Sequence, residues 1–245
     1  MSREPGALLS LLGATAVVTG ARGGIGTHVV RLFRAAGARV LATDLPGSGP
    51  DGEEDFLPCD VSDGAAVAAL AERVKETAGG LDVLVHAAGI VRDAVIWKMD
   101  PQDWDAVLRT NLDSGFHLLR AFAPLLRESE AGAVVLVGSI NGERGKFGQA
   151  NYAASKAGLA ALGRTAAREL GRFGVRVNVI APGLIRTPMT DGLPREVTRR
   201  AEEESALGRI GQPEDVARAA LFLCTALSGH VTGQVLRVDG GQLTV

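Results

Sequence analysis

Three polar residues in the second half of the chain could transfer a proton together. Tyr152 and Lys156, in the segment YAASK, are four residues apart, so they lie on one face of a helix. Ser139 ends the apolar run AVVLVGS thirteen residues before Tyr152. An ammonium group beside a phenol favours the phenolate and lowers the phenol pKa from its ordinary value of about 10. The spacing predicts Tyr152 as a general acid/base, with Ser139 bonded to the same substrate oxygen.

Each of the three residues also has a simpler explanation. A tyrosine on a helix is often a packing residue, a lysine often lies on the surface, and a serine often caps a turn. The combined pattern favours chemistry, because all three stand beside a second motif described next.

A glycine-rich turn near the N-terminus could hold the phosphates of a dinucleotide. The segment TGARGGIG lies between the β-branched run TAVVT and a segment with helical spacing. Gly20, Gly24 and Gly26 would allow a tight turn and close approach of the backbone to phosphate. The N–H groups around Ile25 and Gly26 would face the anion. A plain connection between strand and helix is the alternative.

An acidic residue predicts which dinucleotide is preferred. Asp44 ends the second strand-like run, eighteen residues after Gly26. A carboxylate there accepts hydrogen bonds from ribose hydroxyls and repels a 2′-phosphate, which favours NAD over NADP. Arg22 complicates this prediction, because a guanidinium could bind a 2′-phosphate. Alternatively, Arg22 pairs with Asp44 or points to solvent.

The elements that would position these groups alternate along the chain. Runs typical of buried parallel strands cover residues 14–20, 38–44, 56–60, 81–89, 132–139, 175–183 and 233–241. Helical spacing covers residues 25–36, 63–77, 101–126, 149–173 and 213–223. This alternation predicts an α/β Rossmann fold in one domain over residues 1–245. Its doubly wound, seven-stranded parallel sheet would carry helices on both faces.

Residues 189–207 contain a charged, helix-like stretch, PREVTRRAEEES. Its charges indicate a solvated face, and a mobile lid over a substrate cleft is the second interpretation.

Several further motifs, taken with the first two, resemble those of the short-chain dehydrogenase/reductase family. The motifs are TGARGGIG, CDV, AAG, TNL, GS, YAASK, PG followed by IRT, and VDGG, and they extend from Thr19 to Gly241. Within the family, GSINGERGKFGQANYAASKAGL and GRIGQPEDVARAALFL are similar to 3-oxoacyl-[acyl-carrier-protein] reductases and acetoacetyl-CoA reductases. The resemblance implies an oxidoreductase that transfers a hydride between a nicotinamide cofactor and a carbonyl or secondary alcohol.

The resemblance also implies roles for individual residues. The adenine would be held by Asp60 and Val61. Lys156 would anchor the nicotinamide ribose beside Tyr152, and together with the positive nicotinamide it would lower the Tyr152 pKa. The remaining cofactor contacts would come from Ala88, Gly89, Pro182, Gly183, Ile185 and Thr187. Asn111 would join the catalytic group, interrupting its helix to hold a water that passes protons to solvent.

One motif departs from the family pattern. The usual NNAG reads HAAG, so His86 and Ala87 replace two amides. We expect this change to alter local strand hydrogen bonding rather than the hydride chemistry. His86 could titrate, but a histidine that ends a buried strand is more often a satisfied structural residue.

The substrate is indicated only by its surroundings. Gln149 precedes Tyr152 by three residues and could reach a substrate carbonyl, or it could simply be a polar residue of the first helical turn. The expected mouth is mostly apolar, with Ile90, Trp97, Phe147, Leu184 and Met189. These residues favour an uncharged acyl, alicyclic or aromatic substrate over a sugar.

Three functions remain open from the sequence. The first is an NAD(H)-linked 3-oxoacyl thioester reductase, or 3-hydroxyacyl dehydrogenase in reverse. The second is an NAD-dependent dehydrogenase of a small cyclic, aromatic or steroid-like alcohol. The third is a catalytically silent dinucleotide sensor, which the intact set of polar residues disfavours.

The composition of the chain indicates which partners and which location to expect. A net charge of −2 gives no field to gather nucleic acid or an anionic membrane. Cys59 and Cys224 have no metal-ligand spacing, so no metal site is predicted. No apolar run is long enough to span a membrane, and the apolar N-terminal stretch contains the first strand, so we expect a cytoplasmic protein.

Two kinds of protein partner are also expected. Acyl carrier protein is acidic and could dock on Arg164, Arg168 and Arg172, although the segment RESEAG is acidic. The apolar helices at 101–126 and 149–173 indicate self-association, and the family resemblance implies a homotetramer.

Overall fold

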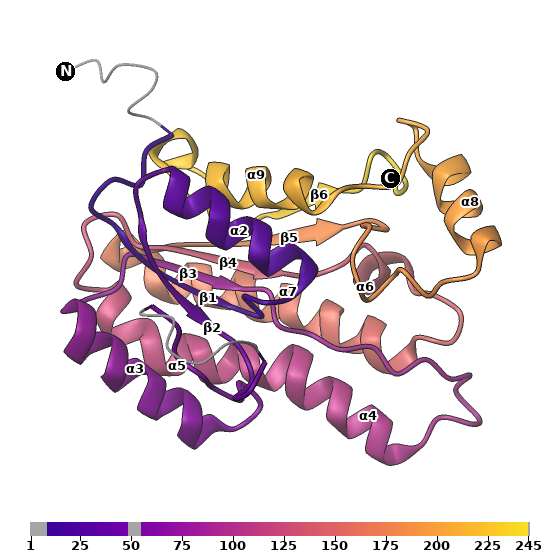
Figure 1. The fold of residues 1–245 in the computed structure, drawn as a ribbon, viewed down its shortest axis with the longest axis horizontal. Helices are drawn as coiled ribbons and strands as arrows, with labels where there is room; N and C mark the ends of the chain where they lie inside the picture. The colour runs from indigo at the N-terminus through magenta and orange to yellow at the C-terminus, as the bar shows by residue number, and fades with distance from the viewer. Residues whose placement is uncertain (1–8, 49–54, 245) are drawn as a thin grey trace.

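All strands of the described chain run parallel in one sheet. The computed structural model describes residues 9–48 and 55–244, and the sheet order is β2-β1-β3-β4-β5-β6 (Figure 1). The strands are β1 (Thr15–Thr19), β2 (Arg39–Thr43), β3 (Val83–His86), β4 (Ala133–Val137), β5 (Arg176–Pro182) and β6 (Val235–Val238). The chain leaves β1 for β2 on one side and returns to β3 on the other. A ligand crevice is therefore expected at the carboxyl ends of β1 and β3.

Helices cover both faces of this sheet, which confirms the doubly wound α/β class (Figure 1). Val18 of β1 belongs to one core with Val29 and Val216, whereas the neighbouring Val17 belongs to the other core with Phe122. This alternation follows from the two-residue period of a strand. The first core includes α2 (Gly24–Ala35) and α9 (Pro213–Cys224), and the second includes α3 (Gly64–Ala78), α5 (Ser114–Leu126) and α7 (Ala150–Leu170).

The seventh strand expected at residues 56–60 is reduced to a single bridge. Phe56 pairs in parallel with Ala42 of β2, and Leu57 N–H donates to the Ala42 carbonyl at 2.8 Å. Hydrogen bonds to the β2 side continue on either side of this bridge, from the Ala42 N–H to the Asp55 carbonyl at 2.8 Å and from the Cys59 N–H to the Asp44 carbonyl at 2.9 Å. The prediction of seven strands is therefore wrong for the described residues, whose sheet has six.

The helix expected over residues 101–126 is broken near its middle. It consists of α4 (Pro101–Leu108), a π-helical turn η1 (Arg109–Asp113) and α5. The Asp100 carboxylate starts α4 by accepting the Gln102 N–H at 2.8 Å. The interruption that the family resemblance implied at Asn111 is present, since Asn111 lies at the centre of the π turn.

The remaining predicted helices are found with small changes at their ends. Residues 149–173 form α7 and a 3₁₀ turn, η2 (Gly171–Phe173), and α9 begins at Pro213 as expected. The charged stretch forms α8 (Arg195–Glu204), which lies at the right-hand end of the molecule (Figure 1). Two short elements complete the described chain, α6 (Asn141–Arg144) and η3 (Ala226–Ser228).

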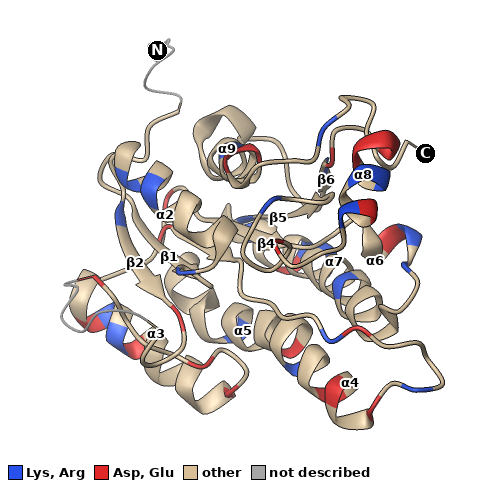
Figure 2. Cartoon of the chain, turned by 45° about the vertical axis from the view of Figure 1, so that its right-hand side comes forward, with Lys and Arg blue, Asp and Glu red and all other residues tan. Residues whose placement is uncertain are grey.

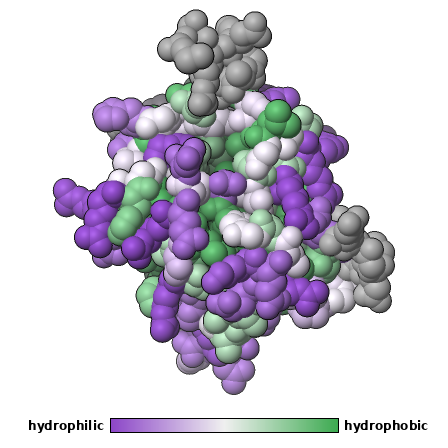
Figure 3. All heavy atoms as spheres, turned by 90° about the vertical axis from the view of Figure 1, so that its left-hand side faces the viewer, coloured by the Kyte–Doolittle hydropathy of each residue, from purple (hydrophilic) through white to green (hydrophobic). Residues whose placement is uncertain are grey.

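The surface carries charges of both signs. Lys and Arg alternate with Asp and Glu along α3 and α8 (Figure 2). The face at the left of Figure 1 intermixes hydrophilic and hydrophobic residues (Figure 3). Among the described residues, no helix combines the length and apolarity needed to cross a membrane.

Candidate active site

A cavity of about 570 Å³ lies at the carboxyl ends of β4 and β5, between the α6 region and α8. Its position at this edge of a doubly wound sheet is the usual one for a ligand site. The predicted residues that line it are Ile25, Gly89, Ser139, Phe147, Gln149, Tyr152, Lys156, Pro182, Gly183, Leu184, Ile185, Thr187 and Met189. The first turn of α2 and the proton-transfer residues therefore border one space.

Other predicted residues lie outside the lining of this cavity. They are Gly20, Arg22, Gly24, Gly26, Asp44, Asp60, Val61, Ala88, Ile90, Trp97 and Asn111. The expectation that Ile90 and Trp97 line the mouth is wrong for this cavity. The Ile90 backbone is held by the Asn111 carboxamide, and Trp97 lies in a turn with 74% of its surface exposed.

The glycine turn is fixed by close backbone approaches. Gly20 has φ +63°, and a Cβ there would lie 2.6 Å from Ala88 N. A Cβ on Gly26 would lie 2.0 Å from the Gly20 carbonyl oxygen. Only glycine fits at either position, so the turn after β1 packs against the backbone that follows β3, and the start of α2 packs against the turn. This backbone cradle suits a pyrophosphate at the helix N-terminus.

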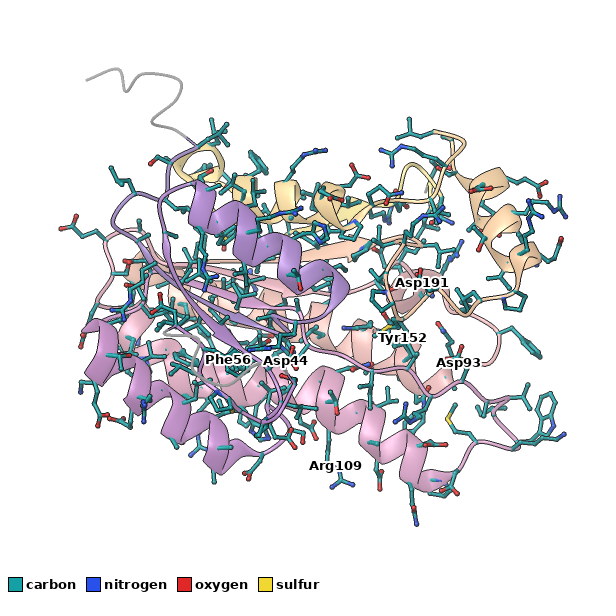
Figure 4. The ribbon with its side chains drawn as sticks, viewed as in Figure 1. Asp44, Phe56, Asp93, Arg109, Tyr152 and Asp191 are labelled. Atoms are coloured by element: carbon teal, nitrogen blue, oxygen red, sulfur yellow. The ribbon has the colours of Figure 1, made fainter. Side chains whose placement is uncertain are left out.

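Asp44 and Arg22 meet beside this turn, but not in the expected way. The Asp44 carboxylate accepts the backbone N–H of Arg22 at 2.9 Å and that of Leu45 at 2.8 Å. The Arg22 guanidinium lies 4.0 Å above the Phe56 ring, and Figure 4 shows Phe56 beside Asp44. Arg22 thus supports the Asp44 carboxylate through its backbone, while its side chain stacks on an aromatic ring.

The predicted adenine residues lie at the turn before α3. The Asp60 carboxylate accepts the N–H and the hydroxyl of Ser62 at 2.9 and 2.7 Å. The Val61 side chain is buried in the core below the sheet. An adenine would therefore meet the exposed Asp60 and the backbone of this turn, and that role remains a prediction.

Tyr152, Ser139 and Lys156 come together as predicted from their spacing. Tyr152 and Lys156 lie on α7, and Ser139 follows β4. The Tyr152 hydroxyl is hydrogen-bonded to Ser139. The Lys156 Nζ lies 5.6 Å from the centre of the Tyr152 ring and donates to the Val137 carbonyl at 2.8 Å.

The pKa of Tyr152 is shifted against the expected direction. Burial raises it, the hydrogen bond from Ser139 lowers it, and the Asp93 carboxylate raises it, with a net upward shift. Burial also lowers the pKa of Lys156 to about 8. The expected lowering of the Tyr152 pKa by Lys156 is therefore wrong for the protein groups alone. Burial dominates, and Lys156 is bonded to a backbone carbonyl instead.

Asn111 joins the end of β3 to α7. Its Oδ1 accepts the Ile90 N–H at 2.8 Å, and its Nδ2 donates to the Ile90 carbonyl at 3.0 Å. The same Nδ2 lies 3.3 Å from the Ser155 Oγ. The side chain is fully buried, so its role in this structure is to hold the loop after β3.

His86 has the structural role that we favoured over titration. Ser114 Oγ donates to the Thr110 carbonyl at 2.6 Å, so it accepts from His86 Nε2 at 2.9 Å. His86 Nδ1 then accepts the Thr19 hydroxyl at 2.8 Å. Burial, with a smaller effect from Lys156, lowers the His86 pKa to about 3. The neutral His86 imidazole, at the end of β3, is therefore hydrogen-bonded to both β1 and α5.

Asp93, Asn141 and Arg144 are among the cavity residues that the sequence reasoning missed. Gln149 Nε2 donates to both Asp93 oxygens at 3.0 and 3.1 Å, and its Oε1 accepts from Asn141 Nδ2 at 3.0 Å. Figure 4 places Asp93 and Tyr152 at the same end of the sheet. Asn141 could have been noticed beside Ser139, but Asp93 is 56 residues from Gln149 and gives no local signal.

The region expected as a lid forms one wall of the cavity. Val197, Arg200, Ala201 and Glu204 of α8 line it, whereas Arg199 of the same helix is exposed and pairs with Glu196 at 2.5 Å. The helix thus has both the solvated charged face and the cleft-covering position considered from the sequence. In residues 9–48 and 55–244, no three His, Cys, Asp or Glu side chains are grouped to hold a metal, and both cysteines are free and buried.

Sequence comparison identifies the class to which this fold and site belong. A family model described as enoyl-(acyl carrier protein) reductase matches residues 20–242. The chain belongs to the short-chain dehydrogenase/reductase family, whose members are nicotinamide-dependent oxidoreductases acting on CH–OH groups.

Three relatives are similar to this chain over nearly its whole length. A 3-oxoacyl-[acyl-carrier-protein] reductase of Thermotoga maritima is 40% identical over 95% of this chain and 99% of its own. An acetoacetyl-CoA reductase of Synechocystis is 39% identical over 93% and 95%. A (3R)-3-hydroxyacyl-CoA dehydrogenase of Mus musculus is 41% identical over 95% and 97%.

A solved structure supports the fold. A protein of Agrobacterium tumefaciens, proposed to be a gluconate dehydrogenase, superposes with a TM-score of 0.91 and 30% identity. The match covers 97% of this chain and 99% of that one.

Proposed function

We propose that this chain is an NAD(H)-dependent oxidoreductase that reduces 3-oxoacyl thioesters of CoA or acyl carrier protein, or oxidises 3-hydroxyacyl thioesters in reverse. The observation that carries the proposal is the meeting of Tyr152, Ser139 and Lys156 in one cavity at the carboxyl ends of the strands. The names of the three relatives, which refer to 3-oxoacyl, acetoacetyl and 3-hydroxyacyl substrates, support this substrate class.

The residues present fit a nicotinamide dinucleotide. The glycine turn leaves no room for a Cβ at Gly20 or Gly26 and exposes the N-terminus of α2 for a pyrophosphate. Asp44, fixed by the Arg22 N–H, supports a preference for NAD over NADP, since a carboxylate repels a 2′-phosphate. Lys156, Ile185 and Thr187 line the part of the cavity assigned to the nicotinamide end. When bound, the nicotinamide donates or accepts the hydride.

Tyr152 and Ser139 both act on the substrate oxygen that gains or loses a proton. During reduction, negative charge develops on the substrate oxygen, and the Tyr152 hydroxyl donates its proton there while Ser139 hydrogen-bonds the same oxygen. The raised pKa of Tyr152 keeps the phenol protonated at neutral pH, which suits reduction. Oxidation requires the phenolate, so its rate is expected to rise with pH through the Tyr152 pKa.

The substrate wall is mostly apolar. Phe147, Leu184, Met189 and Val197 line the cavity, which suits an acyl chain. Asp93 adds a carboxylate, but it is engaged by Gln149. Gln149 is therefore already bonded at both ends of its amide, and its contact with a substrate carbonyl remains a proposal.

Turnover with opposed substrates tests the function. The full chain is assayed for NADH oxidation with acetoacetyl-CoA, and for NAD reduction with cyclohexanol. We expect turnover of the thioester, and Tyr152→Phe should lower it by roughly 10² or more while NADH binding is retained. Turnover of cyclohexanol alone would favour the cyclic alcohol dehydrogenase, and binding without turnover of either would favour the sensor.

Two kinds of protein partner are proposed as well. Arg164 and Arg168 are exposed on α7, and Arg172 lies 4.7 Å above the Phe173 ring, so a basic surface is available for acyl carrier protein. A homotetramer through α5 and α7 is proposed from their apolar composition and from the family. Light scattering at several concentrations would measure the assembly, and a monomer at all of them would contradict it.

A further inference from the structure

A polar contact next to the cavity determines what Ser139 can do with its proton. The backbone N–H of Asn141 donates to Ser139 Oγ at 3.1 Å. An N–H group can only donate, so this contact occupies an acceptor position of the Ser139 hydroxyl. The Ser139 proton is then available to another group.

The next group along is Tyr152. The Tyr152 hydroxyl is hydrogen-bonded to Ser139, and this bond lowers the Tyr152 pKa. Because the Asn141 N–H occupies an acceptor position of Ser139, the Ser139 proton can serve this bond. When Ser139 donates to Tyr152, the Tyr152 proton is left to point into the cavity. Before a substrate oxygen lies beside Ser139, the donors can therefore follow one order, from the Asn141 N–H through Ser139 to Tyr152. When that oxygen is present, Ser139 is already oriented beside the Tyr152 hydroxyl and can donate to the oxygen instead.

The Asn141 carboxamide holds this arrangement from two sides. Its Nδ2 donates to Gln149 Oε1 at 3.0 Å, and its Oδ1 accepts from Arg144 Nε at 3.2 Å. The first contact reaches the start of α7, and the second stays within α6. Both ends of the amide are used, so the orientation of Asn141 is fixed.

The two arms of this network end on opposite sides of the cavity. In the first arm, Gln149 Nε2 donates to the Asp93 carboxylate, in the loop after β3. Arg144 Nη1 donates to Glu204 Oε2 of α8 at 3.0 Å, a contact that lowers the Glu204 pKa. The Ser139 turn is thereby linked by side chains to the wall that covers the substrate.

We propose that Asn141 is a positioning residue that orients the Ser139 hydroxyl toward Tyr152 and links this orientation to α8. The inference rests on the proposed function of Tyr152 as proton donor. Asn141 need not touch substrate, because it acts through Ser139. Among the described residues, Ser139 and Asp93 shift the Tyr152 pKa in opposite directions, and Lys156 lies near the ring.

A titration tests the proposal without turnover. Tyr152 is the only tyrosine of the chain, so the ultraviolet absorbance of the phenolate reports this residue alone. Asn141→Ala keeps the backbone N–H but releases the turn from Gln149 and Arg144, so the Ser139 hydroxyl should be less well oriented and the midpoint should move to higher pH. Ser139→Ala should move it in the same direction, and adding Asn141→Ala to Ser139→Ala should change it no further.

Kinetics give a second measure. Asn141→Ala should lower kcat roughly 10-fold with little change in KM, since a misplaced donor affects the chemical step. Glu204→Gln breaks the outer link and should lower kcat by only about 2-fold, the scale of a partly exposed ion pair. Glu203→Gln is the matched control, because Glu203 pairs with Arg199 on the same helix, and it should match the wild type.

Two results of the titration would overturn the proposal. One is an unchanged tyrosine midpoint in Asn141→Ala, and the other is a further shift when Asn141→Ala is added to Ser139→Ala. If Asn141→Ala fails to fold by thermal unfolding, Asn141→Leu, which is close in shape and lacks the amide, takes its place. Failure of the wild type to turn over acetoacetyl-CoA would count against the proposed function, while the titration would still decide the role of Asn141.

Discussion

The two sides of the cavity are built by different means. On the dinucleotide side, Gly20, Gly26 and Ala88 meet backbone to backbone, at distances that exclude any side chain. On the substrate side, Asn141, Gln149 and the ion pair of α8 are held by side-chain hydrogen bonds. In the proposed function, the first side recognises a group common to all dinucleotides, and the second meets a variable substrate. A backbone site is therefore intolerant of substitution, whereas a side-chain site can be adjusted one contact at a time.

The largest effect is expected on the backbone side. Gly26→Ala would place a Cβ 2.0 Å from the Gly20 oxygen, so the turn must open. We expect NADH affinity to fall by roughly 10² or more, because the phosphate contacts depend on this geometry. Fluorescence titration measures the affinity. Gly171→Ala is the control, since its Cβ would meet nothing within 4 Å, and equal losses in both variants would contradict this account.

A second prediction concerns His86, which connects the strands beneath both sides. Its pKa of about 3 in the folded protein lies below the ordinary value of 6.5, so the unfolded chain binds this proton first as the pH falls. Stability from this residue is complete above pH 6.5 and is lost progressively down to about pH 3. Protonation linked to His86 should lower the free energy of unfolding by roughly 2 kcal/mol between pH 7 and pH 5. His86→Asn should reduce that difference in urea unfolding. A difference equal to that of the wild type would assign the acid sensitivity to other groups.

Asp44 is a side chain on the backbone side, and its effect should be smaller. Asp44→Ala removes the carboxylate that disfavours a 2′-phosphate, so the ratio of kcat/KM for NADH over NADPH should fall roughly 10-fold. Asp55→Ala is the control, because that carboxylate pairs with Arg39 at 3.2 Å. If both variants give the wild-type ratio, Asp44 does not face the ribose.

The smallest effect is expected from a single apolar contact on the substrate side. Met189 lines the cavity and is half exposed, so Met189→Ala removes only part of one contact surface. We expect KM for acetoacetyl-CoA to rise about 2- to 5-fold, with NADH affinity unchanged. A change in NADH affinity instead would show that the two sides are not separable in this way.

The same difference explains what the sequence could predict. The glycine turn and the pair Tyr152 and Lys156 depend on residues close together in the chain, so their spacing is informative. Asp93 reaches Gln149, and Arg144 reaches Glu204, across 56 and 60 residues, and no local pattern reveals such contacts. For the protein groups alone, the Tyr152 pKa was predicted in the wrong direction because burial is a property of the whole fold. The seventh strand was overestimated, because residues 56–60 keep backbone hydrogen bonds to the β2 side but form only one bridge with it.

The π-helical turn at Arg109–Asp113 changes how a long helix is used. A π turn contains one residue more than an α turn, so everything after it is rotated by about 100° relative to an unbroken helix. One continuous rod can then offer one side to α7 before the turn and a different side to α3 after it, as the packing of α4 and α5 requires. Deleting one residue there would straighten the rod and turn its apolar stripe away from the sheet, so the extra residue sets the rotational phase of the whole segment.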